Sequence, residues 1–343
     1  MAGSPTSPSL LACYSEVVKH VPNISLAAYR AGALEASEWQ ALDRACADHG
    51  FFMVSEHGQD EAIEGMWSAS RRFFSSGRAL KRSVLRDAEN PLGYYDRELT
   101  KQKRDQKEVF DFKCGGHQSR NPARRTRWPE LEGFESALDA YFGACRAVAS
   151  EITAMVFMAL GLDDHAARKV DSAVFGEAHT SSSRLNFYPP ADPVPESERG
   201  GVNQLGDMAL HHHTDPGGIT LLLQDQVGGL QALSGDHGWI DVPPCGNHFV
   251  VNLGDVMQVW TNDRYKAAVH RVLPMAAQGS GRYSTPFFYQ PRFDAEICPQ
   301  HVAADDQAHY RPFSWLEFIR GRVTDNYADI GEDDIQISRY RVA

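Results

Sequence analysis

The second half of the chain consists of short apolar runs, and this pattern constrains the fold more than any other feature of the sequence. From Ser181 onwards the runs are RLNFYPP, ITLLLQD, GLQAL, GWIDVPP, HFVVNLGD, AAVHRVLP and YSTPFFYQP, with Gly, Pro, Asn and Asp between them. Strand-length apolar segments at close spacing, separated by turn-forming residues, are typical of a β sandwich or barrel. The sequence therefore predicts a β core in the C-terminal half.

The N-terminal half has a mainly helical pattern instead. ASEWQALDRACADHG (36–50) has apolar residues at helical spacing and ends on a glycine, which is a natural stop signal. FFMVSEHG (51–58) is typical of a buried strand, and NISLAAYR (23–30) of a short strand and turn. Helices are also predicted over 60–74 and, as one or two long helices, over 128–161.

These patterns divide the chain into five parts. A Ser- and Pro-rich segment, 1–20, is expected to be a disordered tail. A helical and strand region (21–130) and a helical connector (131–180) precede the β core (181–290). The last part, 291–343, is expected to pack on the core.

Composition indicates an ordinary globular protein and narrows the range of partners. The chain has 343 residues, and its net charge of -11 disfavours nucleic acid as a partner. Six cysteines without a C-x-x-C pair argue against a disulfide framework or a cysteine-based zinc site. Neither a signal-peptide pattern nor an apolar run of bilayer-spanning length is evident. We expect a cytoplasmic protein without a membrane partner, as a monomer or weak homo-oligomer.

Three side chains form a candidate metal site. His213 and Asp215 stand in H-T-D, and residues i and i+2 of an extended segment point to the same side. His270, in the later run AAVHRVLP, is the best candidate for a third ligand. Two His and one carboxylate bind one face of Fe(II) and leave positions open for substrate and O₂. H-x-D alone is a weak signal, because such a tripeptide arises by chance in many proteins.

A second pair of residues strengthens this interpretation. Arg282 and Ser284 form R-x-S twelve residues after His270, in the next predicted strand, so both side chains would point into one cavity. The planar fork of Arg matches a carboxylate, and Ser adds one donor. The pair would suit the distal carboxylate of a dicarboxylic acid. For R-x-S taken alone, a surface Arg–Asp ion pair is the simpler explanation.

In combination, these motifs resemble the isopenicillin N synthase-like family of Fe(II)/2-oxoglutarate-dependent dioxygenases. GFFMVSEHG is similar to that family's G-F-F-x-V-x-N-H-G segment, and RLNFYPP to its N-Y-Y-P-P segment. HTDPGGITLLLQDQVGGLQAL, VNLGDVMQVWTND with HRV, and RYSTPFFYQP match its later blocks in order. The resemblance covers roughly residues 22–340. It implies a mixed α and β fold, in which a distorted double-stranded β-helix (jelly-roll) core is flanked by helices, mostly from the N-terminal half.

The resemblance also implies a role for individual residues. The iron ligands would be His213, Asp215 and His270. The C5 carboxylate of 2-oxoglutarate would be held by Arg282, Ser284 and the phenol of Tyr188. Asn186 would lie near the metal end of the cosubstrate. Glu56, where the family often has Asn, and Ala268, where Ser is common, depart from the pattern without touching the implied ligands.

The implied reaction requires Fe(II), 2-oxoglutarate and O₂, with ascorbate as a stimulant. It couples release of succinate and CO₂ to oxidation, most simply hydroxylation, of an unactivated C–H bond in a small molecule. Desaturation and ring formation are family variants. Three alternatives stay open: a 2-oxoglutarate-independent oxidase similar to isopenicillin N synthase or aminocyclopropane-carboxylate oxidase, a non-catalytic ligand-binding barrel, and a hydrolytic zinc enzyme. Succinate release separates the dioxygenase from the oxidase.

The substrate is the least constrained part of the interpretation. The candidate pocket residues are aromatic: Tyr94, Tyr95, Phe110, Phe112 and Phe288. Each is equally consistent with plain core packing, because aromatic residues dominate cores. A nearby basic cluster could accept an acidic group, although a solvated surface is the simpler interpretation; it consists of Lys101, Lys103, Arg104 and Lys107.

Overall fold

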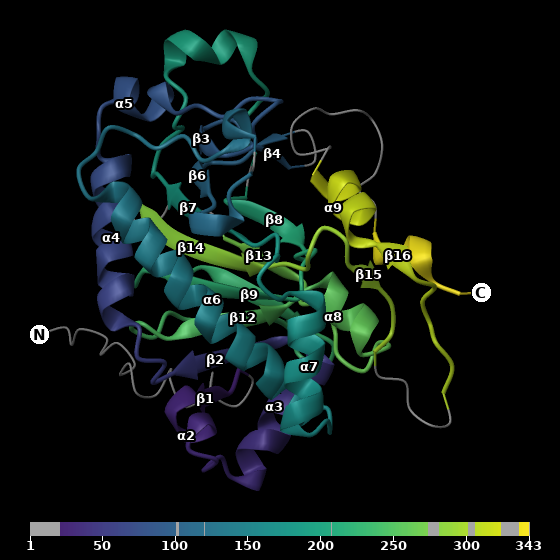
Figure 1. The fold of residues 1–343 in the computed structure, drawn as a ribbon. Coiled ribbons are helices and arrows are strands. Elements are labelled where there is room, and N and C mark those ends of the chain that lie inside the picture. Colours follow the sequence, from purple (N-terminus) through teal and green to yellow (C-terminus); the bar gives the residue numbers. More distant parts are fainter. Residues whose placement is uncertain are drawn as a thin grey trace, which may run out of the picture.

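Two β-sheets form the centre of the computed structural model, which describes residues 21–100, 103–119, 121–206, 208–273, 281–300, 306–323 and 336–342 (Figure 1). The larger sheet has eight strands in the order β1 (Asn23–Ser25), β2 (Phe51–Ser55), β12 (Phe249–Leu253), β9 (Ile219–Gln224), β14 (Arg282–Tyr289), β7 (Ser182–Tyr188), β6 (Glu108–Phe112) and β3 (Gly93–Tyr95). The smaller sheet has four, in the order β11 (Gly238–Asp241), β10 (Leu230–Ser234), β13 (His270–Val272) and β8 (Leu210–His213). The expected tail, 1–20, lies outside the described residues.

Short ribbons and helices surround these sheets. The ribbons pair β4 (Leu99–Thr100) with β5 (Lys103–Arg104) and β15 (Glu296–Ile297) with β16 (Phe313–Ser314). The α-helices are α2 (Leu26–Arg30), α3 (Ala36–Asp48), α4 (Asp60–Phe74), α5 (Arg78–Ser83), α6 (Phe134–Ala159), α7 (Asp164–Val174), α8 (Asp255–Trp260) and α9 (Trp315–Val323). This is the expected jelly-roll core with helices mostly from the N-terminal half. One local expectation was wrong: the turn after β1 is the helix α2, which the hydroxyl of Ser25 caps.

Side chains of the large sheet alternate between two apolar layers. In β2, Phe52 and Val54 pack on the helical side, whereas Phe51 and Met53 pack between the two sheets. This explains why β2 is a continuous apolar run, since a strand buried on both faces has no polar side. The space between the sheets also holds the candidate site.

Strands from the N-terminal region belong to the same sheet as the later strands. β2 pairs with β12, and β6 pairs with β7, both antiparallel. The pairing of β6 with β7 brings Lys107 and Lys113, which flank β6, beside the β core. N-terminal residues therefore form part of the wall of the central cavity.

The helix α6 is long and apolar enough to cross a membrane, by length and composition alone. This differs from the expectation that no apolar run of bilayer-spanning length is present. More than half of its apolar window is buried inside the protein, where it contacts α4, α7 and strands of the large sheet. These contacts are those of a core helix.

Two backbone positions shape the ends of β2. Gly50 has φ +70 and joins α3 to β2, and a Cβ there would lie 2.5 Å from the carbonyl oxygen of Lys266. Glu56 follows β2 with φ 52, a left-handed conformation that Asn adopts more readily than Glu. Its carboxylate accepts a hydrogen bond from Ser25, which ties β1 to this turn.

Candidate active site

The three predicted metal ligands converge at one end of the small sheet. His213 ends β8 and His270 begins β13, and the two residues pair directly across the sheet. Asp215 lies two residues beyond β8. One candidate ligand atom from each side chain lies within 4.8 Å of the other two. Within the described residues, this is the group of His, Cys, Asp and Glu side chains that could hold a metal ion.

The outer atoms of the three ligands are held by protein partners. Nδ1 of His213 lies 2.9 Å from the carbonyl oxygen of His211, and Nδ1 of His270 lies 3.0 Å from that of Ala268. Each Nδ1–H can thus donate to a carbonyl, which leaves both Nε2 atoms as neutral ligands. Oδ2 of Asp215 accepts hydrogen bonds from Thr220 (2.5 Å) and Asn252 (2.8 Å), while its Oδ1 lies 3.7 Å from Nε2 of His213.

The electrostatics of the triad suit a divalent cation. Burial and the neighbouring His270 lower the pKa of His213 to about 3, so the imidazole is neutral and able to coordinate at pH 7. Burial alone would raise the pKa of Asp215, but the two histidines and the hydrogen bonds from Thr220 and Asn252 outweigh it and lower the pKa. The donor set therefore fits Fe(II): two neutral nitrogens and one carboxylate.

Close backbone contacts position Asp215. Its carbonyl oxygen accepts a hydrogen bond from the backbone N–H of Asp255 (2.8 Å), at the start of α8. Gly254 makes this approach possible, because a Cβ there would lie 2.2 Å from the carbonyl oxygen of Gly217. Arg322 of α9 donates to the carbonyl oxygen of Thr214 (2.8 Å) and so secures the same loop from the other side.

Arg282 and Ser284 lie on β14 and point into the same cavity as the triad. Nε of Arg282 donates to the carbonyl oxygen of Gly228 (2.7 Å), and its terminal nitrogens donate to Ser284 (3.1 Å) and Gln224 (3.1 Å). Its guanidinium lies 5.0 Å from the centre of the Tyr188 ring. Burial lowers the pKa of Arg282, although a guanidinium stays charged. The result is a fixed, buried cation that forms no ion pair at contact distance within the described residues, with the Asp225 carboxylate acting on it only at longer range.

The cavity that contains both groups has a volume of about 480 Å³. Asn186 faces it from β7, and its side-chain amide lies 3.4 Å from the hydroxyl of Ser284 on the adjacent strand. The structure thus brings all seven predicted metal and cosubstrate residues to one cavity. A cavity of this size accommodates a small dicarboxylate together with a second small molecule.

Comparison with known proteins agrees with this geometry. Residues 179–291 match the 2OG-Fe(II) oxygenase superfamily, and residues 21–131 match the N-terminal region of the non-haem dioxygenases named for morphine synthesis. Over 297 residues the chain is 32% identical to protein DMR6-LIKE OXYGENASE 1 of Arabidopsis thaliana, covering 81% of this chain and 76% of the relative. Gibberellin 20 oxidase 2 of Oryza sativa subsp. indica is 32% identical, with 80% and 68% covered.

The chain belongs to the 2OG-Fe(II) oxygenase superfamily. It is an Fe(II)- and 2-oxoglutarate-dependent dioxygenase that uses O₂, which confirms the expected family, enzyme class and cofactors. Solved structures of similar fold include a full-length Neurospora crassa protein in complex with alpha-KG (2-oxoglutarate) and thymine, with TM-score 0.73, 26% identity and 90% and 97% of the two chains covered. Another is JOX2 in complex with 2OG, Fe and JA, with TM-score 0.70, 25% identity and 88% and 84% covered.

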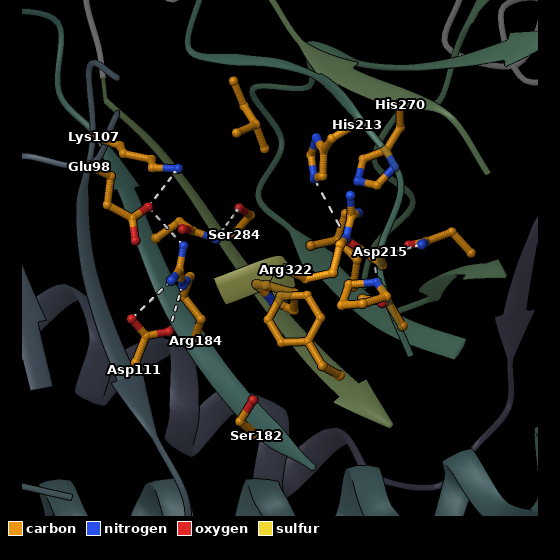
Figure 2. A pocket seen from close by; sticks show the side chains of 18 of the residues that line it. Glu98, Lys107, Asp111, Ser182, Arg184, His213, Asp215, His270, Ser284 and Arg322 are labelled. Carbon is orange, nitrogen blue, oxygen red and sulfur yellow. Dashed lines mark hydrogen bonds and ion pairs between the residues drawn. The ribbon is translucent and has the colours of Figure 1, made fainter. Parts of the chain in front are cut away.

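In this oxygenase, a network of charged side chains forms the cavity wall opposite the triad (Figure 2). Glu98 accepts from Lys107 (2.8 Å) and Arg184 (2.9 Å), and Asp111 accepts from Arg184 (2.7 Å). Arg86, which lies outside the cavity lining, forms ion pairs with Glu98 (2.7 Å) and Asp111 (2.6 Å). Burial alone would raise the pKa of Glu98, but these cations outweigh it and hold the pKa well below its usual range. No motif in the sequence pointed to this network.

The residues of the predicted basic cluster that the structure describes lie in different environments. Lys103 is exposed, as a solvated face would require, and Lys101 lies outside the described residues. Arg104 and Lys107 are buried, which contradicts that interpretation. Arg104 forms an ion pair with Asp192 (2.7 Å), and Lys107 faces the oxygenase cavity.

Most of the predicted aromatic pocket residues do not reach the oxygenase cavity. Tyr94, Phe110 and Phe112 are fully buried in the layer beneath the helices, so the pocket assignment was wrong for them. Tyr95 is half-buried and stacks on Arg86 (4.4 Å from the ring centre) outside the cavity lining. Phe288 does line the cavity. The reason is strand alternation, which turns Phe110 and Phe112 to the face of β6 opposite Asp111.

Proposed function

We propose that His213, Asp215 and His270 hold the Fe(II) of this oxygenase through two Nε2 atoms and one Asp oxygen. When bound together, Fe(II), 2-oxoglutarate and O₂ supply oxidative decarboxylation to succinate and CO₂ with oxidation of a substrate C–H bond. Support comes from the orientation of the ligands, because every outer atom of the triad already has a protein partner.

Arg282, Ser284 and Tyr188 are proposed to bind the C5 carboxylate of 2-oxoglutarate. The observation that carries this assignment is the position of a buried guanidinium in the same cavity as the triad. Burying a cation that has no ion-pair partner at contact distance is costly, so the site is suited to an anionic ligand. Asn186, opposite Ser284 on β7, is proposed to lie at the metal end of the cosubstrate.

The proposed reaction is hydroxylation of a small organic molecule. Two structures of similar fold support the substrate size, since one contains thymine and the other JA beside the cosubstrate. The residues of this chain that would orient the substrate are those of the charged wall, because they lie across the cavity from the triad. Ascorbate is proposed to stimulate turnover.

The remaining proposals concern the setting of the enzyme. Free thiols at five described cysteines suit a reducing cytoplasm: Cys46, Cys114, Cys145, Cys245 and Cys298. We propose a monomer or weak homo-oligomer that acts on a small molecule, without nucleic acid or membrane as a partner.

Succinate formation tests the proposed function. Protein loaded with Fe(II) and given 2-oxoglutarate in air should release succinate slowly even without a substrate, and Asp215→Ala should abolish the release. Oxygen consumption that does not require 2-oxoglutarate would favour the oxidase alternative. Release that persists in Asp215→Ala would refute the assignment of the metal site.

A further inference from the structure

The cavity-lining residues of β7 (Ser182–Tyr188) follow one another from one end of the cavity to the other. Ser182, Arg184, Asn186 and Tyr188 all face it, because alternate residues of a strand share one side. On β14, Arg282 pairs with Tyr188, and Phe288 pairs with Ser182. The seven-residue strand spans roughly 20 Å at about 3.3 Å per residue. The proposed cosubstrate site therefore occupies one end, and the end at Ser182 is available to the substrate.

Lys113 lies at this substrate end. It directly follows β6, whose Phe112 pairs with Ser183, and it lines the cavity. Thr126 fixes its backbone from both sides, accepting from the N–H (2.9 Å) and donating to the carbonyl oxygen (2.8 Å). The ammonium group donates to the carbonyl oxygen of Thr180 and lies 6.0 Å from the centre of the Phe293 ring.

The charge of Lys113 is uncompensated, unlike that of its neighbours. Lys107 and Arg184 form ion pairs with carboxylates of the wall, and Arg322 lies 3.6 Å from Asp255. For Lys113, no carboxylate of the described part of the chain forms an ion pair. Burial alone lowers its pKa to about 8, with no acidic group acting against it, so the ammonium is still mostly protonated at pH 7.

Apolar groups line the same cavity as this charge. Phe293 has 58% of its surface exposed, an unusual state for a large aromatic side chain, and it lines the cavity together with Phe288 and Ile319 of α9. A single ammonium is a compact point charge with three donors, which suits a singly charged anion. Charge and apolar surface together suit a molecule that has one anionic group on an apolar body.

We propose that Lys113 determines substrate specificity by binding the carboxylate of a small monocarboxylic acid, whose apolar body packs on Phe293. This inference rests on the proposed function, because the acid must lie in the cavity that contains Fe(II) and 2-oxoglutarate. Lys113 would bind the substrate without taking part in binding the cosubstrate or the metal.

Matched acids and amides test the proposal. The probes are phenylacetate, 3-phenylpropionate and 4-phenylbutyrate, each compared with its primary amide. Ligand-detected NMR titrations use anaerobic protein loaded with Fe(II) and 2-oxoglutarate. At least one acid should bind about tenfold or more tightly than its amide, because a charge-assisted hydrogen bond is lost in the amide. Equal affinity within every pair, or binding of none of the acids, overturns the proposal.

Variants assign the preference to Lys113. Lys113→Met keeps the length of the side chain and should bring the acid-to-amide affinity ratio close to one, whereas Lys113→Arg should retain most of it. Lys103→Met, at an exposed lysine, is the matched control and should behave as the wild type. Phe293→Ala, also at an exposed position, should weaken acid and amide alike. A preference that survives in Lys113→Met overturns the assignment.

Succinate formation without a probe separates this proposal from the proposed function. It should be equal in the wild type and Lys103→Met, and a 2-oxoglutarate titration should give the same affinity for Lys113→Met as for the wild type. If the wild type formed no succinate, the proposed function would be contradicted, irrespective of the probe affinities. Weaker 2-oxoglutarate binding in Lys113→Met, with thermal unfolding unchanged, would place Lys113 in the cosubstrate site, which overturns its role as a substrate residue.

Discussion

Replacing Arg282 tests the proposed cosubstrate site most sharply. A guanidinium has five N–H donors. Gly228, Gln224 and Ser284 each accept one hydrogen bond, from the three different nitrogens, and each terminal nitrogen has a second N–H. Arg282 can therefore offer further N–H donors to a carboxylate from a position that its other contacts already fix.

The expected loss of affinity follows from this geometry. A hydrogen bond to a charged group contributes about 1.5–3 kcal/mol, which corresponds to roughly 10- to 150-fold in a binding constant. Arg282→Gln should weaken 2-oxoglutarate binding by that factor and leave Fe(II) binding unchanged. Arg282→Lys should lose less, because it keeps the charge but not the planar fork.

Calorimetric titration of 2-oxoglutarate into anaerobic, Fe(II)-loaded protein measures the effect. Arg168→Gln is the matched control, since that arginine is exposed on α7 and forms an ion pair with Asp164 (2.9 Å). Thermal unfolding of each variant checks that the fold is retained, because Arg282→Gln leaves the carbonyl of Gly228 without its donor. Affinity for 2-oxoglutarate within about twofold of the wild type would refute the clamp assignment.

Three further predictions concern the support of the site and the stability of the fold. Thr220→Val removes a hydrogen bond to Asp215 without changing the side-chain shape, and it should weaken Fe(II) binding roughly 10- to 100-fold; an unchanged Fe(II) titration would show that this contact does not orient the ligand. Gly254→Ala puts a Cβ 2.2 Å from the carbonyl oxygen of Gly217, so the melting temperature and Fe(II) affinity should both fall, and a variant with both at wild-type values would contradict the close approach. Burial raises the pKa of Asp171 from its ordinary value of 3.8 to about 6. The folded state is therefore more stable at low pH, where this carboxyl is protonated, and about 3 kcal/mol of stability is lost as the pH rises from about 4 to about 6. Denaturant titrations should therefore give free energies of unfolding for the wild type and Asp171→Asn whose difference changes by about 3 kcal/mol between about pH 4 and about pH 6. A difference that stays constant over this range would contradict the pKa shift.

The metal and cosubstrate residues could be predicted because their signal is local. His213 and Asp215 are two residues apart, as are Arg282 and Ser284, and the strand period places both members of each pair on one face. The one long-range step was the pairing of His213 with His270. It could be anticipated because the resemblance covered both motifs.

The charged wall of the cavity, which contains Glu98, Lys107, Asp111 and Arg184, could not be predicted in the same way. Its ion pairs join distant segments, as Glu98 and Arg184 do, and composition gives no indication of such partners. A usable signal was nevertheless present in β6 and its flanks. Lys107, Asp111 and Lys113 have the same parity along the strand and face the cavity, whereas Phe110 and Phe112 have the opposite parity and face the helices. Choosing residues by aromatic character selected the wrong face.

One spectroscopic titration tests the central claim, that a single cavity holds Fe(II) on the triad and 2-oxoglutarate on the Arg282 clamp. Anaerobic protein with Fe(II) should develop a weak visible charge-transfer band as 2-oxoglutarate is added. The band should be absent in Asp215→Ala and should require roughly 10- to 150-fold more 2-oxoglutarate in Arg282→Gln. Fe(II) binding without any band, or a band that is unaffected by both substitutions, would contradict the account.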